Sequence, residues 1–167
     1  MGFKKTSDVL TISGSVTETA ANTFTQETVN LPLDPLNNEV FVVLAMDLDV
    51  EAPSNVAGTS TSSSGSLSVT SQTGVIGIDN PRCLAKGLKQ IVQSAGTVDG
   101  AAFTEVEGNT PAANIDYIAI IATDDFHAQI VGDNNTAAKT MRFRMWGYRA
   151  RADASTYAAL VQSELLS

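Results

Sequence analysis

Five carboxylates have the residue type and spacing to do chemistry. Asp47, Asp49 and Glu51 alternate with apolar residues, so a strand would point all three to one side. Asp124 and Asp125 follow an apolar run and are expected at a strand end. Grouped carboxylate oxygens suit calcium, and paired carboxylates suit glycoside hydrolysis. The alternative is that Asp47 and Asp49 pair with Arg142 and Arg144 or simply face water.

The sequence has few other groups for catalysis or for a transition metal. The one histidine, His127, lies within a strand pattern, and no Gly-x-Ser-x-Gly elbow supplies a nucleophile. The one cysteine, Cys83, is near a possible helix start, which favours a thiolate, but nothing else indicates a thiol enzyme. Two such residues are too few for a structural zinc site, and neither Gly-rich phosphate motif occurs. We therefore expect no enzyme and no cofactor, with calcium as the one alternative.

Half of the ten basic residues lie in one short segment, which is interleaved with aromatic residues: Lys139, Arg142, Arg144, Arg149 and Arg151. Residues 7–80, by contrast, hold nine acids and no base. The basic segment could contact nucleic acid, with Trp146 and Tyr148 as stacking platforms. However, the chain has a net charge of -8, whereas nucleic-acid binders usually carry a basic excess. We favour salt bridges within one molecule or between copies, and expect no direct nucleic-acid binding.

Composition limits the class of protein. A chain of 167 residues most often forms one domain, here 1–167, and 43% hydrophobic residues are enough for a full core. No apolar run reaches the roughly 20 residues that span a bilayer, and the N-terminus has no signal-peptide pattern. Synthesis in the cytoplasm without a signal peptide is therefore expected.

The longest expected strand, residues 39–51, organises the rest. Its apolar residues recur at every second position from Val40 to Val50, which predicts one continuous apolar face. The opposite face is apolar in its first half and acidic in its second half. A strand this long and apolar is expected at the centre of a sheet.

Other strands are expected around it, separated by turn signals, at residues 8–17, 23–33, 66–69, 75–78, 101–107, 115–122, 126–131 and 140–151. The Gly-, Ser- and Thr-rich residues 57–65 predict an exposed loop. Asn80 and Pro81 resemble a helix start and predict one or two helical turns within 84–93, with a strand over 88–93 as the alternative. Asp153 is expected to cap a terminal helix over 153–167, and residues 1–7 are expected to form a flexible arm.

Eight or nine short strands with little helix predict an antiparallel sandwich or barrel. Three stretches, 40–53, 114–132 and 140–166, resemble the single jelly-roll capsid proteins of small viruses and phages. They cover under half of the chain and none is a specific motif. The resemblance implies an all-β antiparallel sandwich of jelly-roll type with about eight strands and a short C-terminal helix. It also implies a virion protein whose partners are copies of itself and other virion proteins.

Such capsid proteins often carry a basic N-terminal arm, but here only Lys4 and Lys5 stand in that place, so direct genome packaging is not expected. The mechanism we expect is self-assembly, in which Arg142 to Arg151 of one copy meets Asp47 to Glu51 of the next. One alternative is a β-sandwich module that binds carbohydrate or a partner protein with the help of calcium. A second alternative is a non-viral filament or surface-layer subunit.

Overall fold

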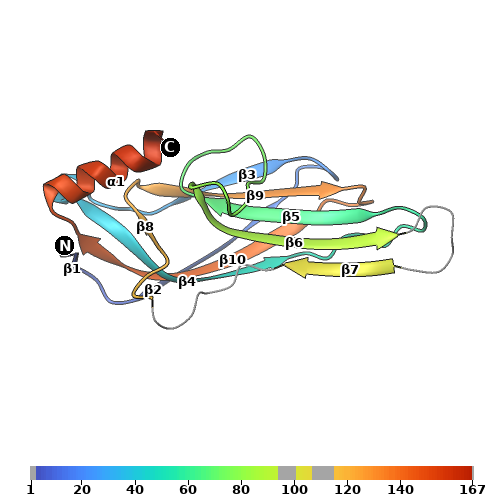
Figure 1. Cartoon of the computed structure of the whole chain (residues 1–167), viewed down its shortest axis with the longest axis horizontal. Helices are drawn as coiled ribbons and strands as arrows, with labels where there is room; N and C mark the ends of the chain where they lie inside the picture. The colour runs from blue at the N-terminus through green and yellow to red at the C-terminus, as the bar shows by residue number, and fades with distance from the viewer. Residues whose placement is uncertain (1–2, 94–100, 107–114, 167) are drawn as a thin grey trace.

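Two antiparallel sheets, A and B, face each other in an all-β sandwich (Figure 1). The computed structural model describes residues 3–93, 101–106 and 115–166. Sheet A contains β1 (Lys4–Lys5), β2 (Leu10–Thr17), β4 (Glu39–Val50), β8 (Ala119–Ile121) and β10 (Thr140–Arg151). Sheet B contains β3 (Thr25–Asn30), β5 (Thr61–Ser68), β6 (Cys83–Gln93), β7 (Ala101–Val106) and β9 (Asp125–Asp133). A 3-10 turn η1 (Pro35–Asn37) precedes β4, and a helix α1 (Ala154–Leu166) follows β10.

The strand order places β10 and β4 in the middle of sheet A, and β9 and β5 in the middle of sheet B. In sheet A, β10 pairs with β4 on one side and with β1 and β2 on the other, while β8 pairs with β4. In sheet B the order is β3-β9-β5-β6-β7. The expected central position of residues 39–51 is therefore confirmed.

Alternating apolar residues of both sheets fill the space between them. On β10, Met141, Phe143 and Met145 point inward and are buried, as their spacing indicates. Phe143 packs edge-on against Phe126 of sheet B, with the ring centroids 5.7 Å apart. Burial of such aromatic rings supplies much of the hydrophobic stabilisation of a sandwich core.

A β-bulge divides β4 into two halves, and the alternation of inward-facing and outward-facing residues is reversed from one half to the other. Trp146 pairs with Ala45 and Gly147 with Val43, so Leu44 is an extra residue. Before the bulge, Phe41 and Val43 face the inter-sheet core, whereas Val40 and Val42 face α1. After it, Met46, Leu48 and Val50 face the core. The expectation of one continuous apolar face from Val40 to Val50 is therefore wrong, because the extra residue reverses the alternation.

Small residues form a buried strand where a loop was expected. Within residues 57–65, the segment from Thr61 onward belongs to β5, and Thr61, Ser63 and Gly65 face the interior. A Cβ atom at Gly65 would collide with the side chain of Met141, so the small residue makes room for a large one on the opposite sheet. Residues 75–78 form no strand, although their apolar pattern predicted one.

The helical turns expected within 84–93 are also absent, because this segment is β6, paired on both sides with β5 and β7. The local signal at Asn80 is real but builds only a turn. Its side chain accepts a hydrogen bond from the N–H of Arg82, and its carbonyl accepts one from Cys83. Pairing with two neighbouring strands outweighs the weak helical spacing that follows.

The N-terminal residues that the structure describes lie along β10, so they are not a free arm. Lys4 and Lys5 pair with Arg151 and Ala150 as β1. The Ser7 hydroxyl then accepts a hydrogen bond from the N–H of Arg149 at 2.9 Å. The expectation of a flexible arm over residues 1–7 is therefore corrected for this part of the segment.

The expected terminal helix is confirmed as α1, which lies on the outer face of sheet A at the end near the N-terminus (Figure 1). Asp153 caps it by accepting a hydrogen bond from the N–H of Thr156 at 2.8 Å, and hydroxyl and N–H donors lower the pKa of this carboxyl to about 2. Tyr157, Leu160 and Val161 pack on the sheet. The one fully buried residue of the helix is Glu164, whose carboxylate accepts hydrogen bonds from the N–H groups of Ala122 and Thr123.

Glu164 should make the docking of α1 depend on pH. Burial raises the pKa of this carboxyl above its ordinary value of 4.5, and the hydrogen bonds from Ala122 and Thr123 offset this only in part. A raised folded-state pKa gives a stabilisation that is complete below about pH 4.5 and is lost as the pH rises through the folded value. Relative to Glu164→Gln, which carries no charge, the wild type should therefore lose stability as the pH rises above about 4.5. Urea unfolding of both proteins on both sides of this pH measures the difference.

The same substitution at the exposed Glu27 is the matched control for this comparison. A difference between wild type and Glu164→Gln that is constant with pH would contradict the assignment.

A cluster of polar groups centred on buried Glu18, Asn135 and Lys139 ties the loops together at the other end of the sandwich, and we call it the Glu18 hub (Glu18, Asn22, Ser54, Gly132, Asn135 and Lys139). The Glu18 side chain is 4% exposed and accepts hydrogen bonds from the backbone N–H groups of Thr23, Gly132 and Lys139. Asn135 exchanges hydrogen bonds with Asn22 and also contacts Ser54. The hub therefore connects the β2–β3, β4–β5 and β9–β10 loops.

Candidate subunit-interaction surface

The outer surface of sheet A carries both members of the charge pairing expected from the sequence. Three neighbouring strands present it, and we call it the charged face (Ser13, Ser15, Asp47, Asp49, Arg142, Arg144 and Trp146). Arg142 lies between Ser15 and Asp49 in the strand register, and Arg144 lies between Ser13 and Asp47. The face therefore has a ridge of long side chains on β10, with short hydroxyls on one side and carboxylates on the other.

Charges on and beside this face balance one another. Arg142 lies 3.5 Å from Asp49, and Lys139 lies 3.6 Å from Glu51. Lys89 reaches from sheet B to Glu105 at 3.2 Å and to Asp49 at 3.8 Å. The Arg142 and Asp49 side chains are 59% and 61% exposed, so this pair is screened by water and contributes about 0–1 kcal/mol. It thus leaves both groups available for a further contact.

Arg144 differs from Arg142 in its partner. Its guanidinium carbon lies 5.8 Å from the centre of the Trp146 ring, a cation–π geometry that holds the arginine along the ridge. Asp47 lies opposite Arg144 in the register and is exposed. The pairing of Asp47 and Asp49 with Arg144 and Arg142, one of the alternatives from the sequence, is therefore present as strand neighbours.

The other two arginines of the expected interface lie away from the charged face. Arg149 is half-buried and lines a small cavity beside Leu31 and Phe41. Arg151 is exposed at the end of β10, opposite Glu39. The structure therefore brings together Arg142, Arg144, Asp47 and Asp49 but separates Arg149 and Arg151 from them, and Glu51 lies beside the group next to Lys139.

The five calcium candidates do not form one group. Asp124 and Asp125 lie at the start of β9, near the Phe41 half of β4, because Ile121 pairs with Phe41. Asp47, the first of the other three carboxylates, lies six residues beyond Phe41 on β4, which corresponds to ~20 Å at the rise per residue of a strand. In the described ranges, no three His, Cys, Asp or Glu side chains gather as metal ligands would. A calcium site thus stays a prediction from the sequence.

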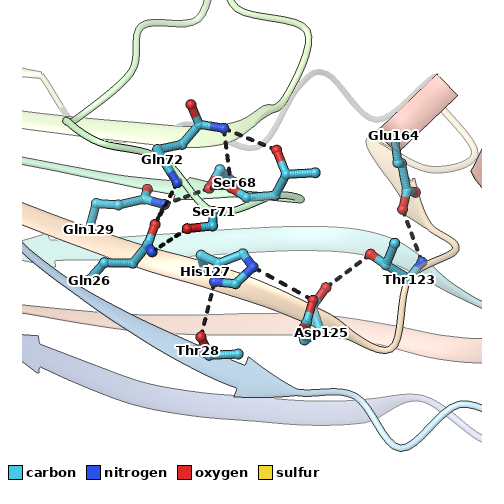
Figure 2. Close-up of polar contacts among 11 residues, drawn as sticks. Gln26, Thr28, Ser68, Ser71, Gln72, Thr123, Asp125, His127, Gln129 and Glu164 are labelled. Carbon is cyan, nitrogen blue, oxygen red and sulfur yellow. Dashed lines mark hydrogen bonds and ion pairs between the residues drawn. The ribbon is translucent and has the colours of Figure 1, made fainter. Parts of the chain in front are cut away.

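His127 belongs to a polar network on the outer face of sheet B (Figure 2). One ring nitrogen lies 3.1 Å from the Thr28 hydroxyl, and the other lies 3.6 Å from Asp125. Next to it, the buried Gln129 hydrogen-bonds to Ser66, Ser68 and Gln26. Gln26 in turn holds the backbone of Gln72, so the 69–82 segment is fastened over this face.

Reasoning from the sequence missed this network. The available signal was the alternation of His127 and Gln129 with apolar residues on β9, which placed two polar groups on the outward side of a central strand. These contacts give His127 a structural environment. They also mean that the outer face of sheet B is partly covered, whereas the charged face of sheet A is open.

Cys83 is half-buried, and burial raises the pKa of its thiol. Its sulfur lies 3.5 Å from the carbonyl oxygen of Ala85, a weak contact at the start of β6. A raised pKa keeps the thiol protonated and therefore a poor nucleophile.

A separate cavity of about 670 Å³ opens between the sheets beyond the end of β8. Its lining is largely apolar and includes Met46, Ile78, Leu84, Leu88, Val106 and Ile118. This volume is within the range of small-molecule or side-chain pockets.

Comparison with protein-family models, with curated proteins and with solved structures returns no match to this chain. In the part of the chain that the structure describes, no helix has both the length and the apolar character needed to cross a bilayer.

Proposed function

We propose that the sandwich is a jelly roll and that the protein is a structural subunit that self-assembles into a viral capsid. The observation that carries this proposal is the nested strand pairing. β2 pairs with β10, β3 with β9, β4 with β8, and β5 with β6. A long hairpin with this nesting, rolled up on itself, produces two four-stranded sheets, and here β1 and β7 add a fifth strand to each. Pairing of β10 with β4 and of β9 with β5 joins the roll.

Jelly rolls occur in capsid proteins, in lectins and in cupins, so the fold alone does not select a function. The charged face supports the structural role. It is open, it lies on the middle strands of a sheet, and its charges balance while the chain as a whole carries -8. Such a surface meets its own copy without the repulsion that the rest of the molecule would impose.

The same contacts support the expectation that this chain does not bind the genome directly. Lys4 and Lys5 are held in β1, and Arg142 and Lys139 already face carboxylates. The partners that we propose are therefore copies of the same chain and other virion proteins.

Light scattering of the purified protein, combined with negative-stain microscopy of the same sample, tests this function. We expect closed particles or rings of uniform size, far above the monomer mass of 17.5 kDa. A monomer at high protein concentration, across salt and calcium concentrations, would overturn the proposal. Long filaments or flat lattices would instead identify the second alternative, a filament or surface-layer subunit.

A binding module is the runner-up function, and the apolar cavity between the sheets favours it. The lining by Met46, Leu84 and Leu88 suits an apolar side chain of a partner protein better than it suits a sugar. A calcium-dependent module would lose thermal stability in chelator, whereas a capsid subunit without calcium would not.

A further inference from the structure

We infer that two copies of this chain pack with their charged faces together, related by a two-fold axis that runs along the strands between β4 and β10. This inference rests on the proposed self-association and names the contact that performs it. Its basis is the side-by-side arrangement of an arginine column and an aspartate column on one open face.

A two-fold axis in that position exchanges the two columns. β10 of one copy then lies over β4 of the other, and the reverse holds on the other side of the axis. Because Arg142 pairs with Asp49 and Arg144 with Asp47 at the same heights, each arginine lies over an aspartate of the facing copy. Long side chains are thereby placed opposite short ones, so the two ridges do not collide. The axis also brings the α1 helices of both copies to the same end of the pair, so the two sheets diverge toward that end and meet only over the charged face.

The local charges favour this contact. Each aspartate would lie between its own arginine and that of the facing copy, and such alternating networks are stronger than isolated surface pairs. Lys139 and Lys89 neutralise the nearby Glu51 and Glu105. The net charge of -8 therefore lies on other surfaces, which the two-fold arrangement keeps apart.

The contact is small. Three strands about 4.8 Å apart and three outward rows about 7 Å apart give a patch of roughly 300 Å² on each copy. This is below the roughly 800 Å² per partner of a stable complex, so we expect a weak contact that becomes effective when many operate in one assembly.

Complementary charge variants test the inference. The acidic variant, Arg142→Asp with Arg144→Asp, presents only carboxylates, and the basic variant, Asp47→Arg with Asp49→Arg, presents only arginines. By sedimentation velocity in low salt, we expect each variant alone to lose self-association. An equimolar mixture should associate at least tenfold more tightly than the wild type, because all pairs across the axis become attractive. The quadruple variant with both changes should regain self-association.

Lys86→Asp is the control, because it adds negative charge on the opposite sheet and should leave association unchanged. Circular dichroism checks that each variant is folded. If a double variant unfolds, the quadruple variant still tests the contact, because an arginine lies beside every aspartate in it. Particles formed equally well by the wild type and by the acidic variant would overturn this contact while the proposed function stands. A mixture that fails to associate would also overturn it. A wild type that is monomeric under all conditions would overturn both proposals.

Discussion

Glu18→Ala should lower the free energy of unfolding by about 3–5 kcal/mol. The substitution leaves the buried N–H groups of Gly132 and Lys139, and the part-buried N–H of Thr23, without their acceptor, and each unsatisfied buried donor costs about 1–3 kcal/mol. The Glu18 hub joins three loops, so the loss is expected to disturb Asn22 and Asn135 as well. Equilibrium urea unfolding, followed by tryptophan fluorescence, measures the change.

Two variants separate the hub from a general effect of removing a carboxylate. Glu18→Gln keeps one acceptor oxygen and should lose less stability than Glu18→Ala. Glu27→Ala removes an exposed carboxylate from β3 and should change stability by less than about 0.5 kcal/mol. Equal losses for Glu18→Ala and Glu27→Ala would show that the hub contributes nothing.

Gly147→Ala should also be strongly destabilising, by about 3 kcal/mol. A Cβ atom here would collide with the carbonyl oxygen of Val42 and lie 2.5 Å and 2.8 Å from two ring carbons of Phe41. The carbonyl belongs to the central strand and Phe41 is fully buried, so neither group has room to move. Inserting one methyl group into a packed core typically costs 1–3 kcal/mol or more, and backbone contact places this site at the upper end. Urea unfolding again measures the loss.

Gly74→Ala is the matched control, because a Cβ atom there would meet nothing within 4 Å. It should leave stability unchanged or raise it by a few tenths of a kcal/mol, since alanine restricts the unfolded chain. If both alanine variants unfold at the same urea concentration, the close approach at the bulge is not as we describe it.

Strong and simple patterns allowed much of the fold to be predicted. β10 follows strict alternation, β4 is long and apolar, and α1 has a capping aspartate with apolar residues on one side, so these elements were expected within a residue or two. The charge neighbours Arg142 and Asp49 were also foreseen as one of two readings. The signals for β10, β4 and α1 each lie within a few residues of the chain, whereas the charge pairing was inferred from the uneven distribution of acids and bases.

The failures share a different physical cause, which is contact between distant segments. The bulge at Leu44 arises where β4 meets the crowded Gly147, and nothing in residues 39–51 indicates it. β5 is rich in serine and reads as a loop, but its small side chains fit against Met141 from the other sheet. Strand propensity cannot report such pairings. The separation of Arg149 from Arg144 was instead available from the sequence, because the two residues are five positions apart on β10 and alternation places them on opposite faces.

The nested pairing of the strands also dictates the order in which the protein can fold. β2 begins at Leu10, yet it finds its partner only when β10, more than 120 residues later, is available. Until then sheet A lacks the strand that joins β2 to β4, whereas every strand of sheet B is already present and can pair. Contacts between such distant segments slow folding to the millisecond-to-second range.

During synthesis, sheet A therefore closes only after β10 has left the ribosome. The charged face takes its arginines from this last strand and its aspartates from β4, so it does not exist on a partly made chain. Nascent chains on one messenger cannot associate through it before they are folded.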